Sequence, residues 1–289
     1  MNLRRILLTT AAAVVAAATA VFAAGELLSV SAHRALPSPP PELAAVAVTL
    51  PVSPNEQIKG WFARGGRGKG AVLLLHGVRG DRTKMLPRAL KLKSQGYSVL
   101  LVDLPAHGES SGNRITFGFR EADGVKAALM FLRETLPTER IGVIGVSLGA
   151  ASLVISKVEP APNAVVLESM YPTITEAVQN RLIARIGRLG VPMSKLLLWQ
   201  LPIRAGITPD QLRPIDALKF LKSPTFIASG VEDLHTTIAE TQRIFAEAPT
   251  PKEFWAVEGA AHVDLYGYDP RTYEQKVFPF LARHLHSEM

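Results

Sequence analysis

The stretch Ile141-Gly142-Val143-Ile144-Gly145-Val146-Ser147-Leu148-Gly149-Ala150 decides the fold of this chain. Residues 141–144 are an apolar run that predicts a buried strand, and the residues after Gly149 suit a helix. Gly-x-Ser-x-Gly at this junction indicates a tight strand-to-helix turn, because glycine leaves room for the chain to pass. The turn raises the Ser147 hydroxyl above the sheet and directs the amino end of the helix at it. We interpret Ser147 as a nucleophile; the alternative is a turn that only packs helix against strand.

On both sides of this turn, predicted strands alternate with predicted helices. Such alternation implies a mostly parallel sheet with helices on both faces. Residues 171–214 interrupt it with helical pieces and no good strand, so we expect a small helical cap there. The fold class is therefore α/β, with an eight-stranded sheet. We expect strands over residues 44–52, 57–63, 71–75, 97–102, 140–144, 164–167, 225–229 and 253–257, and helices over 84–93, 121–136, 148–158, 237–248 and 273–284.

A serine hydroxyl needs a base to take its proton before it attacks, and the chain has seven histidines. His262 lies in Gly259-Ala260-Ala261-His262-Val263-Asp264, a small-residue turn after the last predicted strand. We therefore expect His262 to reach Ser147; the alternative is a surface-loop histidine. His76 and His107 also follow predicted strands, and we interpret both as organisers of their loops. His235 is placed to orient the loop that precedes it.

The carboxylate that orients the histidine is expected after the strand at residues 225–229. The loop there contains Glu232 and Asp233, and we choose Asp233, whose role is to hold the imidazole tautomer and stabilise the imidazolium. Glu232 is expected to be solvated. Glu168, at the end of the strand at 164–167, is the rival, since a carboxylate there also reaches the histidine. Asp264 is interpreted as shaping the His262 loop, together with Asp269.

Two further loops are expected at the same edge of the sheet. His76-Gly77-Val78-Arg79-Gly80 follows the third strand, and the N–H of Val78 is a natural partner for that of Leu148 in an oxyanion hole. One such donor stabilises a transition state by about 3 kcal/mol. The motif from Asp103 to Gly112, which includes His107, follows the fourth strand. Its polar side chains are interpreted as tying that loop down.

Together these residues resemble the α/β-hydrolase superfamily, over about residues 43–285. The order Ser147, Asp233, His262 is the superfamily's order of nucleophile, acid and histidine. The His-Gly, Asp-x-x-x-His-Gly-x-Ser and Gly-x-Ser-x-Gly patterns make the chain most similar to the esterase and serine-aminopeptidase-like branch. It departs from the lipase type, since it has no His-Gly-Gly-Gly at the oxyanion loop. It also lacks a large accessory domain such as a propeller, which argues against an oligopeptidase.

The predicted function is a serine hydrolase that cleaves carboxylic esters or thioesters through an acyl-enzyme. An aminopeptidase or amidase of the same fold is one alternative, and a non-catalytic, envelope-anchored interaction protein is another. The chain has no cysteine, which excludes disulfides, thiolate zinc sites, iron–sulfur clusters and a cysteine nucleophile. We expect no cofactor and no metal, and a small-molecule or lipid-like ester as the substrate.

The amino terminus has the pattern of a targeting segment. Arg4 and Arg5 precede residues 6–24, a run of 19 residues without a charge that includes nine alanines. A positive start and an apolar run are typical of a secretory signal peptide or of an uncleaved signal anchor. Small residues near positions 18–23 offer cleavage sites, whereas the length of the run favours an anchor. A buried amphipathic helix is the third interpretation, which the lack of a polar face disfavours.

From this pattern the chain is predicted to have three parts. Residues 1–24 are the signal peptide or signal anchor, residues 25–42 are a proline-rich linker, and residues 43–289 are the hydrolase domain. We expect an exported protein. It is either anchored to the membrane through residues 6–24, or secreted or periplasmic after cleavage.

The formal net charge is +7, but the basic residues are scattered between apolar runs, and we expect no nucleic-acid partner. Within the cap, Arg181, Arg185 and Arg188 recur at helical spacing, so we expect them on one face of a helix. The plain interpretation is a solvated basic face. The sharper one is that the arginines face an anionic membrane surface, while Leu182 and its apolar neighbours Ile186 and Leu189 roof an acyl pocket.

Overall fold

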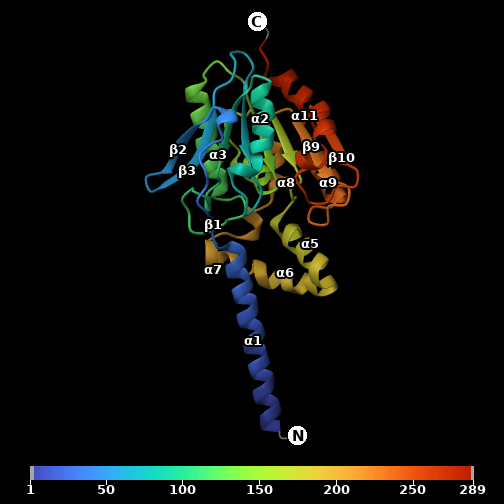
Figure 1. The fold of residues 1–289 in the computed structure, drawn as a ribbon. Helices are drawn as coiled ribbons and strands as arrows, with labels where there is room; N and C mark the ends of the chain where they lie inside the picture. Colours follow the sequence, from blue (N-terminus) through green and yellow to red (C-terminus); the bar gives the residue numbers. More distant parts are fainter. Residues whose placement is uncertain (1–2, 288–289) are drawn as a thin grey trace.

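A central eight-stranded sheet organises the computed structural model, which describes residues 3–287 (Figure 1). In spatial order its strands are β10 (Lys252–Val257), β9 (Thr225–Gly230), β8 (Ala164–Glu168), β7 (Ile141–Val146), β4 (Ala71–Leu75), β5 (Ser98–Val102), β3 (Glu56–Ala63) and β2 (Val46–Ser53). β3 runs antiparallel to both of its neighbours, and the other adjacent pairs are parallel. The expected α/β-hydrolase fold, with a mostly parallel eight-stranded sheet, is confirmed.

The central strands are apolar on both faces because helices cover both sides of the sheet. Along β4, Leu73 and Leu75 belong to one core cluster, and Val72 and Leu74 belong to the other. The first cluster lies under α3 (Glu121–Thr135), α4 (Leu148–Ser156) and α9 (Ile238–Glu247). The second lies under α2 (Leu86–Ser94) and α11 (Pro270–Leu285). A continuous apolar run therefore suits each of these strands.

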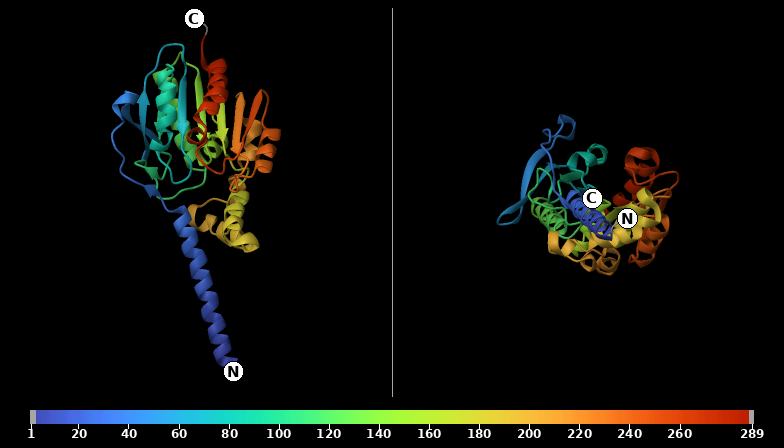
Figure 2. Two further views of the ribbon diagram at one scale, coloured as in Figure 1. Left: turned by 45° about the vertical axis from the view of Figure 1, so that its right-hand side comes forward. Right: turned by 90° about the horizontal axis from the view of Figure 1, so that it is seen from below.

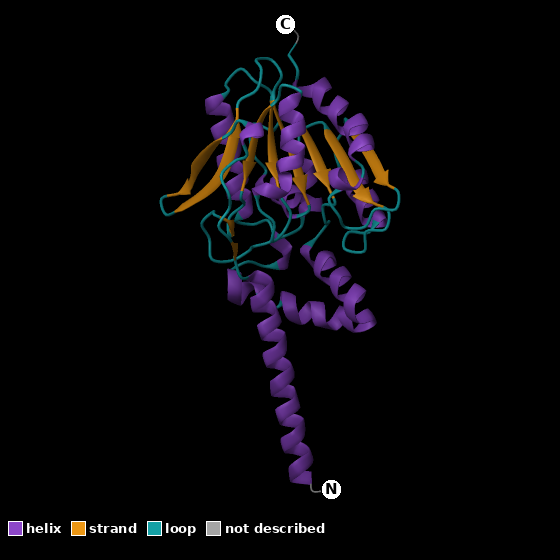
Figure 3. Cartoon of the chain, viewed as in Figure 1, coloured by secondary structure: helices purple, strands orange, loops and turns teal. Residues whose placement is uncertain are grey.

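The carboxyl ends of the parallel strands point toward the end of the body from which the remaining helices project (Figure 3). Between β8 and β9 the chain forms α5 (Ile174–Ile186), α6 (Gly190–Leu198) and α7 (Leu201–Ala205), within the segment expected to be a cap. In parallel sheets, ligand sites form in the loops at the carboxyl ends of the strands. The cap therefore lies over that edge.

The amino-terminal region differs from the expected linker. One helix, α1, runs over Leu3–Ser29, so the prediction of a linker is wrong for residues 25–29. The helix continues because Gly25 fits against the cap, where a Cβ would lie 2.4 Å from the Gln200 amide oxygen. Beyond it, β1 (Ala32–His33) pairs with β6 (His107–Gly108). Residues 1–2 of the expected targeting segment and residues 288–289 of the expected hydrolase domain lie outside the described residues.

Most of α1 stands away from the body (Figure 2). Its stretch Leu7–Ser29 includes an 18-residue window with a mean hydropathy of 2.1 and is long and apolar enough to cross a membrane. A signal sequence passes the same test of length and composition, and so does a buried core helix. In this structure, however, none of the described residues of that 18-residue window is buried.

Candidate active site

Ser147 occupies the turn between β7 and α4 in a backbone conformation that L-residues rarely adopt, with φ 49° and ψ −105°. Close packing on both sides requires the two glycines of the motif. A Cβ on Gly145 would lie 2.7 Å from the backbone of Ala150, and one on Gly149 would lie 2.6 Å from the Leu75 carbonyl oxygen. The Ser147 hydroxyl is buried and has no hydrogen-bond partner within the described residues.

The structure joins His262 to Asp233. His262 Nδ1 lies 2.7 Å from Asp233 Oδ2. An ionised carboxylate only accepts, so Nδ1 carries the proton and Nε2 has a free lone pair. The two loops approach closely because Gly230 has no side chain, and a Cβ there would lie 2.1 Å from the Ala260 carbonyl oxygen. His262 and Ser147 line one cavity of about 480 Å³.

The surroundings of Asp233 keep it charged. Burial disfavours its ionised form, but the hydrogen bond and charge of His262 act against burial. They hold the pKa of Asp233 below its usual value, with help from two backbone donors. Those donors are the N–H groups of His235 and Thr236, at 2.7 and 2.9 Å from Oδ1. Asp233 is thus fixed in place as the acceptor for the imidazole.

The rival carboxylates are engaged elsewhere. Glu168 is buried and accepts hydrogen bonds from Arg88 at 2.6 Å and from the Tyr273 hydroxyl. Asp264 lies 2.5 Å from the other terminal nitrogen of Arg88, and Glu232 is exposed. Of the carboxylates that the sequence nominated, Asp233 is therefore the one that contacts His262.

The Arg88 cluster is a feature that the sequence reasoning missed. Burial disfavours the Arg88 cation, but Glu168, Tyr273 and Asp264 together outweigh burial and raise the pKa of Arg88 above its usual value. The guanidinium joins α2 to the end of β8 and to Asp264, two residues beyond His262. A signal was present in the sequence, because Arg88 falls between Met85 and Leu92 on the buried face of α2.

A second cavity, of about 240 Å³, opens beside Ser147. Val78 and Leu148, the expected oxyanion residues, line it together with Ser147. Apolar side chains from three helices complete the wall: Leu28, Ile174, Val178, Leu182 and Leu197. The size and lining suit the acyl part of an ester. The contribution of Leu28 means that the last turn of α1 is part of this wall.

His76, His107 and Asp103 lie inside the loops, as predicted. The Nε2 atom of His76 accepts from the Leu104 N–H at 3.0 Å, and Nδ1 of His107 is 2.9 Å from the Pro105 carbonyl oxygen. Asp103 accepts from the backbone and the side chain of Arg82, at 2.8 and 2.7 Å. These contacts hold the loops that border the cavities.

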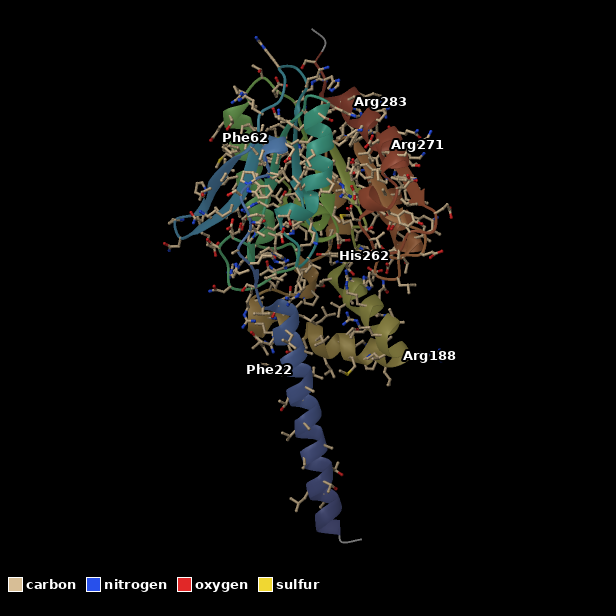
Figure 4. All side chains as sticks on the ribbon, in the orientation of Figure 1. Phe22, Phe62, Arg188, His262, Arg271 and Arg283 are labelled. Carbon is tan, nitrogen blue, oxygen red and sulfur yellow. The ribbon has the colours of Figure 1, made fainter. Side chains whose placement is uncertain are left out.

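The three arginines of the cap do not share one face, because α5 ends at Ile186 and Gly187 follows with φ 62°. Arg188 is exposed at the tip of the cap (Figure 4). Arg181 lines both cavities, so the prediction that it faces solvent or a membrane is wrong. Leu182 lines the acyl-sized cavity as expected, whereas Ile186 and Leu189 are exposed.

Several known proteins resemble this chain in sequence or in structure. An uncharacterized protein of Bacillus subtilis is 21% identical over 244 residues, which are 83% of this chain and 80% of that protein. An uncharacterized protein of Mycobacterium tuberculosis is 28% identical over 240 residues, 81% of this chain and 78% of its own. An esterase of Pyrococcus furiosus superposes with a TM-score of 0.73 at 24% identity, covering 89% of this chain and 98% of that one.

A thermophilic esterase of Thermogutta terrifontis superposes with a TM-score of 0.60 at 18% identity, covering 84% of this chain and 99% of its own. At such identities the two structural likenesses show the fold alone. A family model described as the alpha/beta hydrolase family matches residues 72–284, from β4 into α11. That match includes the loops of Ser147, Asp233 and His262, and the chain therefore belongs to the alpha/beta hydrolase family.

Proposed function

We propose that this hydrolase cleaves carboxylic esters or thioesters through an acyl-enzyme on Ser147. The observation that carries the proposal is the hydrogen bond between Asp233 and His262 at the rim of the cavity that contains Ser147. No hydrogen bond joins the Ser147 hydroxyl to His262 within the described residues. In enzymes of this kind that contact often tightens only when substrate binds.

In the proposed reaction, His262 Nε2 takes the Ser147 hydroxyl proton while Oγ bonds to the carbonyl carbon of the substrate. The N–H groups of Val78 and Leu148 stabilise the resulting oxyanion. The intermediate collapses, the bond to the alcohol or thiol breaks, and His262 returns its proton to the leaving group. A water molecule then gives a proton to His262 and attacks the acyl carbon. Ser147 leaves with that proton.

The composition of the two cavities favours an ester over an aminopeptidase substrate. A free α-amino group calls for a carboxylate to receive its charge. Among the described residues that line the two cavities, Asp264 is the one acid, and Arg88 already neutralises it. The cavity beside Ser147 is instead lined largely by apolar groups, as an acyl chain requires.

We also propose that α1 is retained as a membrane anchor. Its carboxyl-terminal turns are tied to the body: Gln200 donates to the Val21 carbonyl at 3.1 Å, and the Arg204 guanidinium lies 4.0 Å from the centre of the Phe22 ring. Glu26 forms ion pairs with Arg204 and, at 3.1 Å, with Arg114. Cleavage after Ala23 would remove Val21 and Phe22 from these contacts.

Fluorophosphonate labelling and ester turnover test the proposed reaction. The full chain is expected to label and to hydrolyse p-nitrophenyl esters faster than aminoacyl amides. Ser147→Ala should abolish labelling and reduce ester turnover by on the order of 10³-fold or more, with the fold intact. Val154→Ala, in the helix behind the turn, serves as a control that retains the nucleophile. Normal turnover by Ser147→Ala contradicts the mechanism, and inertness of the full chain favours a non-catalytic protein.

A further inference from the structure

The cap exposes an apolar surface that is unusual for a soluble protein. Leu189, Trp199 and Ile203 are 70%, 69% and 62% exposed, and Leu196 is 50% exposed. These four side chains, which we call the cap face, follow one another from the end of α5 to α7. Single exposed apolar residues are normal on a protein surface, but a cluster marks a site of interaction.

The charge of the surrounding segment indicates what the cap face contacts. Residues 181–206 contain five arginine or lysine residues and no aspartate or glutamate. Arg188 and Lys195 are exposed beside the apolar side chains. Apolar and basic side chains together, with a tryptophan among them, are typical of helices that lie at the surface of an anionic bilayer.

The position of α1 supplies the second observation. α1 and the cap project from the same end of the body, and α6 lies crosswise to α1 (Figure 1, Figure 2). Residues 7–24, the uncharged part of α1, would extend about 27 Å as a helix, and Val21 and Phe22 near its end already contact the cap. A hydrocarbon core is about 30 Å thick. A bilayer crossed by this helix would therefore begin close to the level of α6 and α7.

We propose that the cap face docks on the anionic bilayer in which α1 is anchored, so that the enzyme acts on amphiphilic esters within that bilayer. The proposal rests on the proposed function. The acyl-sized cavity is lined by α1, α5 and α6, the same elements that border the cap face. An ester therefore reaches Ser147 from the bilayer without crossing water, with its acyl chain among Leu28, Leu182 and Leu197.

Tryptophan fluorescence tests the docking without any need for activity. The chain has three tryptophans, and Trp61 and Trp255 are buried in the body. The full chain is reconstituted in vesicles of phosphatidylcholine and phosphatidylglycerol with brominated or ordinary acyl chains. Brominated chains should quench the emission of Trp199, measured as the difference between the full chain and its Trp199→Phe variant. Absence of quenching in a protein that resists carbonate extraction overturns docking and leaves the anchor intact.

A variant of the cap face tests the consequence for catalysis. Leu189→Ser, Leu196→Ser and Ile203→Ser, combined in one full chain, should reduce kcat/KM on a vesicle-borne ester about tenfold or more. Turnover of water-soluble p-nitrophenyl butyrate should not change, because none of the three lines the cavities at Ser147. Val46→Ser with Met130→Ser, exposed on other elements, is the matched control. Equal activity of both variants on vesicles overturns the proposal, and loss of all ester turnover in the parent chain contradicts the proposed function instead.

Arg181 carries an independent inference about the substrate. It lines both cavities and is partly buried, and its guanidinium donates to the Ala177 carbonyl at 2.9 Å. Within residues 3–287 it forms no ion pair. Lys84 lines the larger cavity as well, and Arg185 lines the smaller one. A partly buried cation without an ion-pair partner is costly unless a ligand neutralises its charge.

We infer that Arg181 binds an anionic group, a carboxylate or a phosphate, on the alcohol part of the ester. This inference also rests on the proposed function. It is tested with 4-butyryloxybenzoate and 4-butyryloxyphenyl phosphate against neutral 4-butyryloxybenzamide. In Arg181→Met the ratio of kcat/KM for the anionic over the neutral ester should fall about tenfold or more, and in Arg181→Lys it should fall less. Of the two anionic esters, the one whose kcat/KM ratio falls more in Arg181→Met identifies the anionic group that Arg181 binds.

Equal ratios in the parent and both variants overturn the assignment to Arg181. Retained turnover of the benzamide ester in the same assay keeps that outcome separate from a failure of the proposed function.

Discussion

At the residue scale, Ser147 depends on neighbours that have little or no side chain. The positive φ of Ser147 costs on the order of 1–3 kcal/mol, and the rest of the turn must hold it there. Gly145 and Gly149 allow α4 to pack against β7 and β4 at distances that a Cβ would prevent. The packing of α4 against β7 and β4 thus holds Ser147 in its strained conformation. In that conformation Ser147 lines the cavity that His262 also lines.

Substitution of the two carboxylates distinguishes their roles. Asp233→Asn should keep the fold and reduce ester turnover by on the order of 10⁴-fold, because an amide next to Nδ1 favours the wrong tautomer. Glu168→Gln should reduce turnover less than about tenfold, since its contacts are with Arg88 and Tyr273. Steady-state kinetics on p-nitrophenyl butyrate measures both, with circular dichroism as the check on folding. The reverse order of effects would assign the acid to Glu168.

His76 should make the stability of the protein depend on pH. Burial lowers the pKa of His76 to about 3, from an ordinary value of 6.5. Between these values the unfolded chain binds a proton that the folded protein excludes, so stability is lost as the pH falls through this window. From pH 7.5 to 5 the loss is about 2 kcal/mol for this group.

Urea unfolding at pH 7.5 and pH 5 measures this dependence. The drop in the free energy of unfolding should be smaller in His76→Gln than in the parent chain. Partial burial also lowers the pKa of His284, and His284→Gln should reduce the drop less than His76→Gln does. An equal drop in all three proteins contradicts the assignment to His76.

The sequence predicted Ser147, His262 and Asp233 because each follows a strand at a loop with a short-range pattern of its own. It did not predict that Arg88 pairs with Glu168 or that the Arg181 side chain lines the cavities, because both depend on contacts between distant segments. Arg88 meets Glu168, 80 positions away, through the packing of α2 against the sheet. Helical spacing put Arg181 beside Arg185 and Arg188, but spacing alone does not reveal that the helix ends at Ile186.

At the element scale, a buried cation joins three elements behind the active site. Arg88 on α2 contacts Glu168 at the end of β8 and Asp264 at the start of the short helix that follows His262, while Tyr273 on α11 bonds Glu168. Such a cluster contributes little net stability when complete, but it is costly to break, since removal of one partner leaves the others buried and unpaired. In the proposed mechanism, this cluster positions the His262 loop through the contact of Arg88 with Asp264.

Arg88→Met should destabilise the protein by about 3–5 kcal/mol, because it leaves Glu168 buried without its cation. Arg88→Lys should cost less, since an ammonium keeps the charge but loses the fork that reaches Glu168 and Asp264 together. Urea unfolding at neutral pH measures both variants. At temperatures where Arg88→Lys is folded, a fall in kcat with little change in KM is expected if the His262 loop is displaced. Unchanged stability in Arg88→Met contradicts the account.

The order of strands and helices was predictable because each central strand is a short apolar run that ends at a loop signal. The end of α1 was not, since Gly25 and the prolines beyond it suggested a break. In the structure Gly25 instead permits contact with Gln200, and helix-breaking proline does not occur until residue 37. A glycine thus marks a close approach here and the end of a helix elsewhere.

At the scale of the whole molecule, α1, the cap and the carboxyl edge of the sheet occupy one end of the body, and the carboxyl terminus of the chain lies at the other (Figure 1). The last turn of α1 serves this end twice, by binding Arg204 through Glu26 and by placing Leu28 in the wall of the acyl-sized cavity. The proposed anchor and the proposed substrate site are therefore joined in one structural unit.

Truncation at two positions separates these roles. A protein that starts at Val21 lacks most of the apolar helix but keeps Leu28, whereas one that starts at Glu42 loses Leu28 and β1 as well. Leu28 is partly exposed, so its contact with an acyl chain is worth about 1 kcal/mol, or about fivefold in kcat/KM. Only the protein that starts at Glu42 should show this fall in kcat/KM. The fall should be larger on octanoyl than on acetyl p-nitrophenyl esters. Identical chain-length profiles for the two truncated proteins would show that α1 is not part of the acyl site.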